Sequence, residues 1–351
     1  MRAPLHVLVV DDSAVVRQTL RAILQSQPDI RVTVAPDAVI AQERLRRQRA
    51  DVIVLDLEMP RMDGLTFLRT LMRADPVPVV VCSGRVGGGT CDAMQALREG
   101  AVELIAKPRV GIRGFLEESA VLIVDAVRAA AQTTLRRRPG SAPRQVMPLR
   151  HHATAPRVVA IGASTGGTEA LRALLGALPA DMCAVAVVQH MPSPFTRQFA
   201  KHLDEVSPLL VREARDGEEL RDGTALIAPG DRHMTVRSSG TRMVVALHDG
   251  PLVSRHRPSV DVLFRSVAET VGSSAVGVIL TGMGADGATG LLEMRKAGAT
   301  TIAQDEESCV VFGMPREAIA RGAAEAVLPL DAIPAALAAA LTAPAASRRC
   351  K

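Results

Sequence analysis

Short runs of aliphatic residues alternate along the chain with longer stretches in which apolar positions recur at helical spacing. In the first third, this pattern predicts strands that are each followed by a helix, with a glycine-rich loop at 87–89 before the fourth helix. The strands are expected at 6–10, 32–35, 52–55, 77–82 and 102–106, and the helices at 14–25, 37–48, after the turn at 59–64, at 92–98 and at 111–131. Such alternation predicts an α/β fold with a doubly wound, five-stranded parallel sheet.

The alternation begins again at Val158 and predicts a second α/β unit with a mostly parallel sheet. Strands are expected at 158–161, 183–189, 225–228, 275–280 and 300–304, with a hairpin within 231–247. Helices are expected from the turn after 161 to 178, then at 195–203, 260–271, 291–296 and 333–341.

A stretch without apolar periodicity separates the two halves. Residues 136–143 combine arginine, proline and glycine, which is typical of a flexible linker. We therefore predict a first domain over 4–122, a linker over 123–156, a second domain over 157–342 and a tail over 343–351. The length of 351 residues agrees with two domains.

Composition narrows the classes of function. The chain has no Trp or Tyr and only 6 Phe, so it lacks stacking platforms for single-stranded nucleic acid, which is not an expected partner. The net charge of +5 comes partly from the arginines around the linker. The 5 scattered cysteines form no Cys-x-x-Cys pair and favour a reducing compartment. The apolar run before Asp11 is too short for a signal peptide or a membrane span. We expect a cytoplasmic protein without membrane insertion.

Carboxylates follow two of the predicted strands in the first domain. Asp11 and Asp12 end the first strand and Asp56 ends the third, at the sheet edge where α/β proteins place ligands. A hard cation such as Mg²⁺ would relieve their mutual repulsion. Asp56 is then a candidate nucleophile for a phosphoryl group, and Lys107 and Ser83 are candidate contacts of that group. The alternative is a solvated acidic rim.

A glycine-bracketed Ser164-Thr165 pair follows the first strand of the second domain. The sequence predicts a buried strand, a tight turn and a helix start, with an exposed Ser164 hydroxyl beside free helix amides. This setting suits a nucleophilic serine. Two other interpretations remain open for the turn alone, a plain helix cap and a phosphate-binding loop. The sequence contains neither a Walker A motif nor Gly-x-Gly-x-x-Gly, which disfavours nucleotide binding.

His190 and Asp286 also follow predicted strands. An imidazole can accept a serine proton near neutral pH, and a carboxylate can orient it. Taken singly, His190 is an ordinary strand-end residue and Asp286 a turn residue, but together with Ser164 they form a candidate hydrolytic triad. The glycines around Met283 would let backbone amides face an oxyanion. The chain order Ser-His-Asp argues against the α/β-hydrolase fold.

Residues 4–122 resemble a response-regulator receiver domain, which has a flavodoxin-like fold. The resemblance rests on Asp11-Asp12, Asp56, the turn 59–64, Ser83 and Lys107-Pro108. It implies phosphorylation of Asp56 by a histidine kinase, with Mg²⁺ held by Asp11, Asp12, Asp56 and the Glu58 carbonyl. It also implies that Ser83 and Lys107 contact the phosphoryl group. Leu104 stands where receivers usually carry an aromatic switch residue.

Residues 157–342 closely resemble the catalytic domain of chemotaxis protein-glutamate methylesterases. The matching blocks lie at 162–167, 189–192, 195–196, 261–264, 277–287, 298–299, 303–306 and 312–315. The resemblance implies a nucleophilic Ser164, a proton-transferring His190 and an orienting Asp286. It suggests the Met283 amide as an oxyanion donor, with Thr165 near the oxyanion. No cofactor is implied for the esterase reaction.

A receiver joined to such a domain implies an esterase that is activated by phosphorylation and has methyl-accepting chemoreceptors as its substrates. The family's reactions are hydrolysis of glutamate γ-methyl esters and deamidation of specific glutamines, which give chemotactic adaptation. We expect a monomer that is recruited to membrane receptor arrays, with a receiver that covers the catalytic edge until Asp56 is phosphorylated. The alternative function is a non-catalytic regulator that docks on a signalling array, with Ser164 as a mere cap.

Overall fold

A computed structural model describes residues 3–84, 88–108, 113–133 and 157–342. The chain divides into two compact units, Met1–Arg138 and Pro139–Lys351. The predicted linker stretch at 136–143, the first glycine of the loop at 87–89, the start of the helix expected from 111 and the tail at 343–351 lie outside the described residues. No helix among the described residues is long and apolar enough to cross a membrane.

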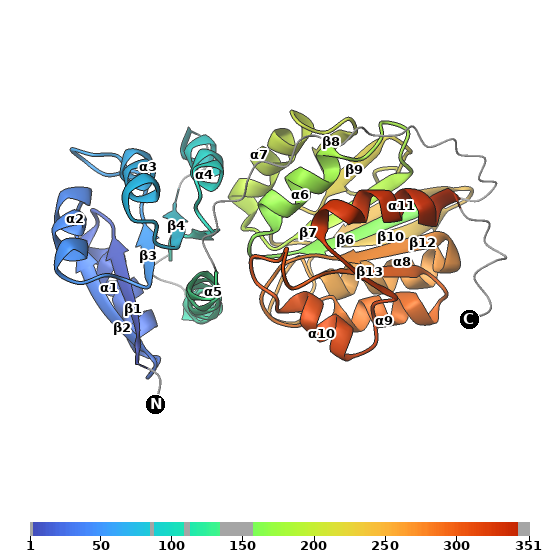
Figure 1. The fold of residues 1–351 in the computed structure, drawn as a ribbon. Coiled ribbons are helices and arrows are strands. Elements are labelled where there is room, and N and C mark those ends of the chain that lie inside the picture. Colours follow the sequence, from blue (N-terminus) through green and yellow to red (C-terminus); the bar gives the residue numbers. More distant parts are fainter. Residues whose placement is uncertain (1–2, 85–87, 109–112, 134–156, 343–351) are drawn as a thin grey trace. The chain divides into compact units, whose positions relative to one another are not determined.

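The N-terminal unit contains the predicted five-stranded parallel sheet, with strand order β2-β1-β3-β4-β5 (Figure 1). Its strands are β1 (Leu5–Val10), β2 (Ile30–Ala35), β3 (Val52–Leu55), β4 (Val79–Ser83) and β5 (Glu103–Ala106). Its helices are α1 (Ala14–Gln25), α2 (Ala38–Arg47), α3 (Gly64–Ala74), α4 (Gly88–Arg98) and α5 (Arg113–Ala131). Strands β3 and β4 are buried along their whole length, as expected for a sheet covered on both faces.

Short polar side chains start three of these helices. The side chains of Ser13, Asp37 and Asp63 accept hydrogen bonds from the first-turn amides of α1, α2 and α3. One sequence prediction is wrong here. Gly88 and Gly89 belong to α4 rather than to a loop, because the helix begins earlier than the apolar pattern at 92–98 suggested.

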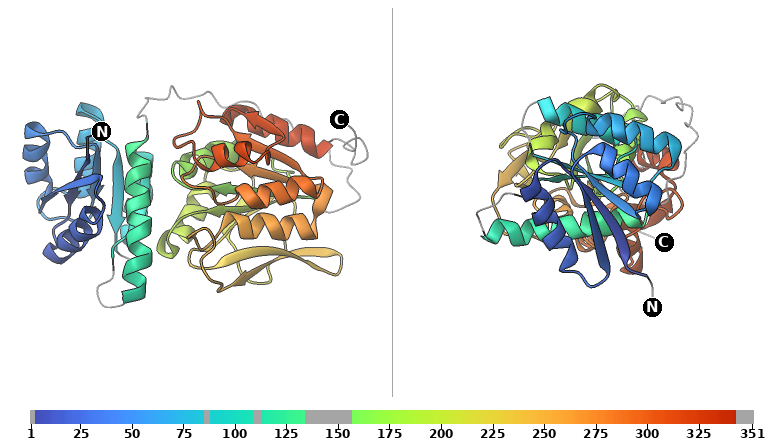
Figure 2. Two further views of the ribbon diagram at one scale, coloured as in Figure 1. Left: turned by 90° about the horizontal axis from the view of Figure 1, so that it is seen from below. Right: turned by 90° about the vertical axis from the view of Figure 1, so that its left-hand side faces the viewer.

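The C-terminal unit, coloured from green to red in Figure 2, is built on a seven-stranded sheet of order β14-β13-β12-β6-β7-β9-β8, in which every pairing is parallel. Its strands are β6 (Val158–Ala163), β7 (Ala184–Gln189), β8 (Leu210–Glu213), β9 (Thr224–Ile227), β12 (Ala275–Ile279), β13 (Thr300–Gln304) and β14 (Ala326–Leu328). A separate antiparallel hairpin pairs β10 (His233–Ser239) with β11 (Arg242–His248). The hairpin and the parallel sheet confirm the predicted α/β architecture.

Helices cover both faces of this sheet. One layer contains α8 (Val260–Thr270), α9 (Ala288–Lys296) and α10 (Met314–Ala320), and the other contains α6 (Gly167–Gly176), α7 (Ser193–Asp204) and α11 (Ile333–Thr342) (Figure 1). Short 3₁₀ turns lie at Gly272–Ser274 and Leu330–Ala332. The sequence pattern did not predict β8, β14 or α10, which are short, and it began α7 at residue 195 rather than at Ser193.

Candidate active site

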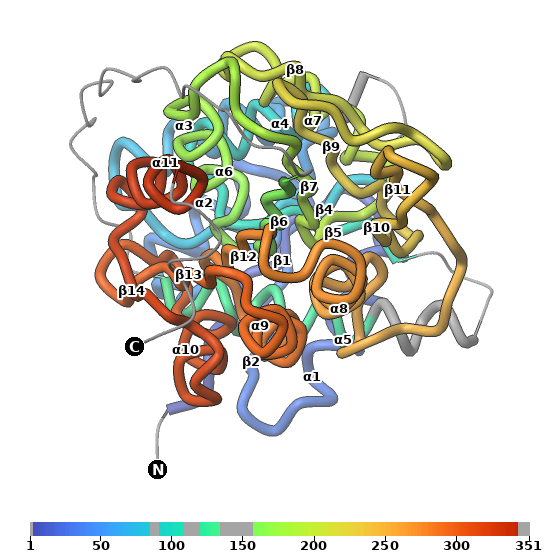
Figure 3. The backbone as a smooth tube through the Cα atoms, turned by 90° about the vertical axis from the view of Figure 1, so that its right-hand side faces the viewer, coloured from blue at the N-terminus to red at the C-terminus, as the bar shows by residue number. Residues whose placement is uncertain are grey.

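The order of strands in the C-terminal sheet creates the site. Strand β6 lies at the centre, between β7 on one side and β12 on the other (Figure 3). Ala163 pairs with Gln189, so the next residues, Ser164 and His190, leave the sheet at the same edge. Strand β12 feeds the loop that carries Asp286 to that edge. This is the point where the strand order reverses, which is the usual ligand site of open α/β sheets.

The backbone of Ser164 is held on both sides. Its amide donates to Thr281 O at 3.0 Å, and its carbonyl accepts from Gly167 N at 2.7 Å and from Gln189 Nε2 at 2.9 Å. The residue as a whole is buried, with 8% of its surface exposed, so less of it is open to solvent than the sequence suggested.

Ser164 does not cap helix α6. The N-cap is Gly166, which has a φ of 77° and makes no side-chain cap bond. A Cβ at Gly166 would lie 2.4 Å from Cβ of Val310, so neither the backbone conformation nor the space admits a larger residue. The capping interpretation of Ser164 is therefore wrong, and its hydroxyl is not used by the helix.

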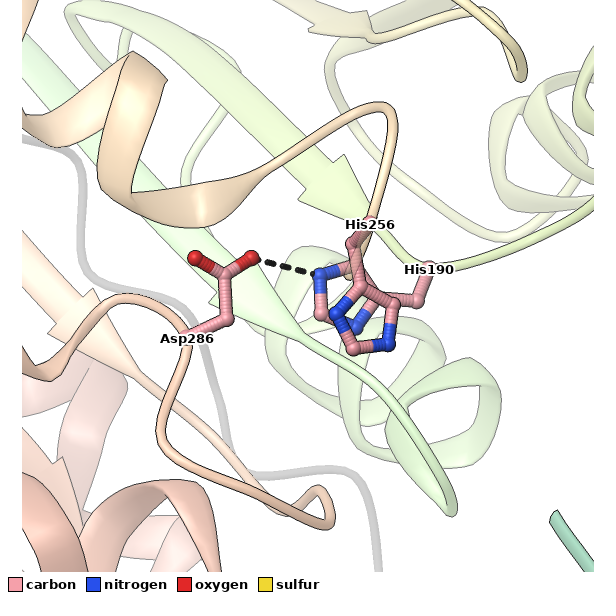
Figure 4. Close-up of side chains that lie close together, drawn as sticks. All are labelled: His190, His256 and Asp286. Carbon is pink, nitrogen blue, oxygen red and sulfur yellow. Dashed lines mark hydrogen bonds and ion pairs between the residues drawn. The ribbon is translucent and has the colours of Figure 1, made fainter. Parts of the chain in front are cut away.

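His190 and Asp286 form a direct pair (Figure 4). His190 Nε2 lies 2.8 Å from Asp286 Oδ2. The same carboxylate accepts hydrogen bonds from the Ser259 hydroxyl at 2.8 Å, from Val260 N at 2.7 Å and from Asp261 N at 3.1 Å. These donors form the N-terminus of α8, where backbone amides and the helix dipole favour a negative charge.

The charge of Asp286 follows from these contacts. Burial alone raises the pKa of Asp286, but the hydrogen bonds from His190, Ser259 and Val260 outweigh it and lower the pKa to about 2. The ionised carboxylate has no proton to donate, so His190 Nε2 must carry the hydrogen that the two share. His190 Nδ1 then has a free lone pair. That nitrogen is buried and has no hydrogen-bond partner among the described residues.

Some predicted contacts are not made. No hydrogen bond joins the Ser164 hydroxyl to His190 in the described part of the chain, although neighbouring strands bring the two residues to one edge. Catalytic hydrogen bonds are often long in structures without substrate.

Gly282 lies against the serine, since a Cβ there would come within 2.7 Å of Ser164 Cβ. Its neighbour Met283 and the residue Thr165 both have backbone N–H groups that donate to no described residue, so both stay available to an oxyanion.

Several residues of the site escaped the sequence interpretation. His256 stacks on His190 with ring centroids 3.7 Å apart and an interplanar angle of 6°. Gln189 Nε2 also donates to His190 O at 3.1 Å, which ties the serine and histidine loops together. Ser259 was not predicted because a serine before a helix is indistinguishable in sequence from an ordinary cap. His256 follows no strand and has no motif of its own.

The N-terminal unit brings its predicted carboxylates together. Oxygens of Asp11, Asp12 and Asp56 lie within 4.8 Å of one another. Lys107 Nζ lies 2.7 Å from Asp56 Oδ2 and 2.9 Å from Asp11 Oδ2. Burial raises the pKa of Asp56 more than Lys107 lowers it. Burial alone lowers the pKa of Lys107, but its bonds to Asp56 and Asp11 raise it overall. The solvated acidic rim is excluded for Asp11 and Asp56, which are buried, whereas Asp12 is exposed.

Two other predicted residues adjoin this carboxylate cluster. Ser83 is buried at the end of β4, where it pairs in register with Ala106 of β5, next to Lys107. The exposed Glu58 follows Asp56 by two positions, and its amide donates to Asp56 Oδ1 at 3.2 Å. Leu104, in the place of the expected aromatic residue, is buried in β5. The donor set consists of carboxylate and carbonyl oxygens, which fits Mg²⁺.

Comparisons with known proteins agree with both units. The family described as CheB methylesterase matches residues 159–337, and the response regulator receiver domain family matches residues 7–115. A protein-glutamate methylesterase/protein-glutamine glutaminase of Anaeromyxobacter dehalogenans is 57% identical over 344 residues, which is 94% of this chain and 95% of the relative. Another from Geobacter metallireducens is 54% identical over 343 residues, covering 94% of this chain and 97% of the relative.

A solved structure resembles the C-terminal unit. The CheB methylesterase catalytic domain of Thermotoga maritima has 41% sequence identity and a TM-score of 0.52, and the match covers 53% of this chain and 99% of that one. Fold and site thus define a protein of two α/β units, with a carboxylate cluster at the sheet edge of the first and a histidine–aspartate pair beside a serine at the sheet edge of the second. The chain belongs to the CheB methylesterase family and carries a response-regulator receiver domain.

Proposed function

We propose that this chain is a serine esterase that hydrolyses glutamate γ-methyl esters on chemoreceptors and deamidates specific receptor glutamines, under control of phosphorylation at Asp56. The names of its relatives, protein-glutamate methylesterase/protein-glutamine glutaminase, support both reactions. The observation that carries the proposal is the pairing of His190 Nε2 with the ionised Asp286, which leaves His190 Nδ1 as a free, buried base.

The proposed base is one atom of the His190 ring, Nδ1. Because Asp286 accepts at Nε2, His190 Nδ1 takes the proton from the Ser164 hydroxyl as Oγ attacks the ester carbonyl carbon. A C–O bond forms between substrate and serine, and the carbonyl oxygen becomes an oxyanion. The backbone N–H groups of Thr165 and Met283 donate to that oxygen. Asp286 stabilises the imidazolium that forms on His190.

Collapse of the tetrahedral intermediate completes the first half-reaction. The bond from the carbonyl carbon to the methoxy oxygen breaks, and His190 Nδ1 returns its proton to that oxygen. Methanol departs, and an acyl-serine remains on the protein. Water then loses a proton to the same nitrogen and attacks the acyl carbon. The serine leaves with that proton and the glutamate side chain is free. A glutamine amide follows the same path with ammonia as its leaving group, because it presents the same kind of carbonyl.

The receiver unit has the parts that phosphoryl transfer requires. Asp56 is the proposed acceptor, and Asp11, Asp12, Asp56 and the Glu58 carbonyl are the proposed holders of Mg²⁺. When bound, this ion neutralises charge on phosphoryl oxygens. Lys107 now bridges Asp56 and Asp11, so it is placed to exchange one of these carboxylate contacts for a phosphoryl oxygen. The phosphodonor proposed is a histidine kinase of the chemotaxis type.

A docking-only regulator is the less favoured function. It would need Ser164 for helix capping, and Gly166 occupies that position instead. It would also give no reason for a buried aspartate with a lowered pKa paired to a histidine at the same sheet edge.

The test is methanol release from methylated receptor membranes, measured with and without a small-molecule phosphodonor and Mg²⁺. Release is expected to rise with the phosphodonor, to lose that rise in Asp56→Asn and to be abolished in Ser164→Ala. Ser238→Ala is the matched serine control, because Ser238 lies on the exposed end of the β10–β11 hairpin. Methanol release by Ser164→Ala at the wild-type rate would overturn the esterase mechanism. Methanol release that does not rise with the phosphodonor in the intact chain would overturn only the control by phosphorylation of Asp56, and the esterase mechanism would stand.

A further inference from the structure

The ring of His256 lies against the imidazole of the proposed base. We propose that His256 is a positioning residue, whose flat face fixes the plane in which His190 transfers the serine proton. This inference rests on the proposed function, because it assigns to His190 the role of base. The two rings are nearly parallel, at 6°, with centroids 3.7 Å apart (Figure 4).

The contact supplies a restraint that Asp286 cannot supply. The hydrogen bond from His190 Nε2 fixes one atom of the ring, so the ring can still tilt about that atom. A second ring stacked on its face removes the tilt, because tilting would separate or overlap the two π surfaces. The position of His190 Nδ1 is thereby defined, and a proton transfer depends steeply on such placement.

His256 is itself held firmly. Its Nδ1 lies 2.7 Å from the Ser254 carbonyl, which can only accept, so Nδ1 carries the hydrogen. A tight turn presents the ring, since Val253 and His256 exchange both backbone hydrogen bonds, at 3.1 and 2.9 Å. The two central residues, Ser254 and Arg255, have φ values of 51° and 68°, which residues other than glycine seldom adopt. Such backbone strain clusters at functional sites.

The same segment reaches the other half of the catalytic pair. Three residues after His256, the Ser259 hydroxyl and the following amides bind the Asp286 carboxylate. Between them, Arg257 Nη1 donates to Gly250 O at 2.7 Å, and Arg257 O accepts from Asp231 N at 3.2 Å. Residues 253–261 therefore hold the acid through hydrogen bonds and the base through a ring face, as one anchored unit.

The stacked ring must stay neutral to serve in this way. An imidazolium forms on His190 during the attack, and a second cation against its face would oppose it. Burial lowers the pKa of His256 most, and the charges of His190 and Arg255 lower it further. Asp286 raises it, but the resulting pKa is about 3. The groups around the ring thus keep it uncharged at the pH where the enzyme works.

The test compares three replacements in the full chain, assayed by methanol release. His256→Phe keeps a flat face, His256→Asn keeps a side-chain amide donor for the Ser254 carbonyl but has no ring, and His256→Ala keeps neither. We expect kcat to fall about 10-fold in the Ala and Asn variants with KM nearly unchanged, and to stay within about 3-fold of wild type in the Phe variant. Leu252→Ala, an exposed change on the same segment, is the matched control.

Full kcat in His256→Ala and His256→Asn would overturn the inference, as would a Phe variant as impaired as the Asn variant. Should the Ala variant fail to fold, the Phe and Asn pair decides. His190→Ala separates the two proposals, because activity in that variant would overturn the proposed function itself.

Discussion

The Ser259 hydroxyl donates a hydrogen bond to Asp286 Oδ1 over 2.8 Å, and both residues are buried. Oδ1 also accepts from Asp261 N, whereas Oδ2 pairs with His190 and accepts from Val260 N. The bond from Ser259 contributes to the low pKa of Asp286. Ser259 is in turn fixed by His233, whose Nδ1 accepts the Ser259 amide at 3.2 Å.

Replacement of Ser259 by alanine should therefore lower kcat while the chain still folds. Asp286 would keep its bonds from His190, Val260 and Asp261 but lose a donor to its charged form, a contact worth about 1.5–3 kcal/mol. We expect kcat to fall about 10-fold at an unchanged KM. Steady-state methanol release checks this, with Ser239→Ala on the exposed end of the hairpin as control. An unaltered kcat would show that the remaining donors hold the carboxylate without Ser259.

The second prediction concerns a steric clash at Gly282. A Cβ there would lie 2.3 Å from Met314 Sδ and 2.7 Å from Ser164 Cβ. Gly282→Ala should thus lower the free energy of unfolding by about 1–3 kcal/mol and displace the serine. Gly284→Ala is the control, because its Cβ meets nothing within 4 Å and only its φ of +85° opposes the change. Urea unfolding and kcat are to be measured on both, and equal losses would exclude the clash as the cause.

The neutral His256 predicts a pH dependence of stability. Its pKa is about 3 in the folded chain, against an ordinary value of 6.5, so between these values the unfolded chain binds a proton that the folded chain does not. This contribution to stability is complete above pH 6.5 and is lost as the pH falls toward 3. Its slope is at most about 1.4 kcal/mol per pH unit. His256→Phe should show a flatter dependence in urea unfolding, and the same slope as wild type would contradict the assignment.

The receiver unit predicts a specific effect on metal affinity. Asp12 is the exposed carboxylate of the cluster, so Asp12→Asn should leave the fold intact and weaken Mg²⁺ binding by on the order of 10-fold. Calorimetric titration with Mg²⁺ measures this directly. Asp75→Asn removes an equally exposed carboxylate far from the cluster in sequence, at a surface ion pair with Arg49 that contributes little. Equal Mg²⁺ affinity in both variants would show that Asp12 is not a ligand of the ion.

The sequence was sufficient to predict most strands of the two sheets, because these strands are strongly apolar and end at polar residues. Strand β7 and strand β12 are buried at every position, and such runs are unambiguous. Strand β8 was not predicted because it lies at the edge of its sheet and only Val211 of its residues is buried. Strand β14 has three residues, none of them buried, which is too little pattern to detect.

The candidate site was predictable only in part, for a similar reason. Ser164, His190 and Asp286 follow strands, and strand ends reveal which residues meet at an edge. His256 reaches the site through the turn around Ser254 and Arg255, and no periodicity reports where a turn directs the next side chain. The burial of Ser164 also depends on tertiary contacts, such as the hydrogen bond from its amide to Thr281 O, which have no local signature in the sequence.

The central position of strand β6 has a consequence for how activity arises during synthesis. Ser164 and His190 leave the ribosome early, whereas Asp286 lies 96 positions after His190 and must add from the opposite side of that strand. A nascent or truncated chain that ends before this point holds a serine without an oriented base. Under the proposed mechanism, hydrolysis of an ester or amide therefore begins only once the chain extends past Asp286.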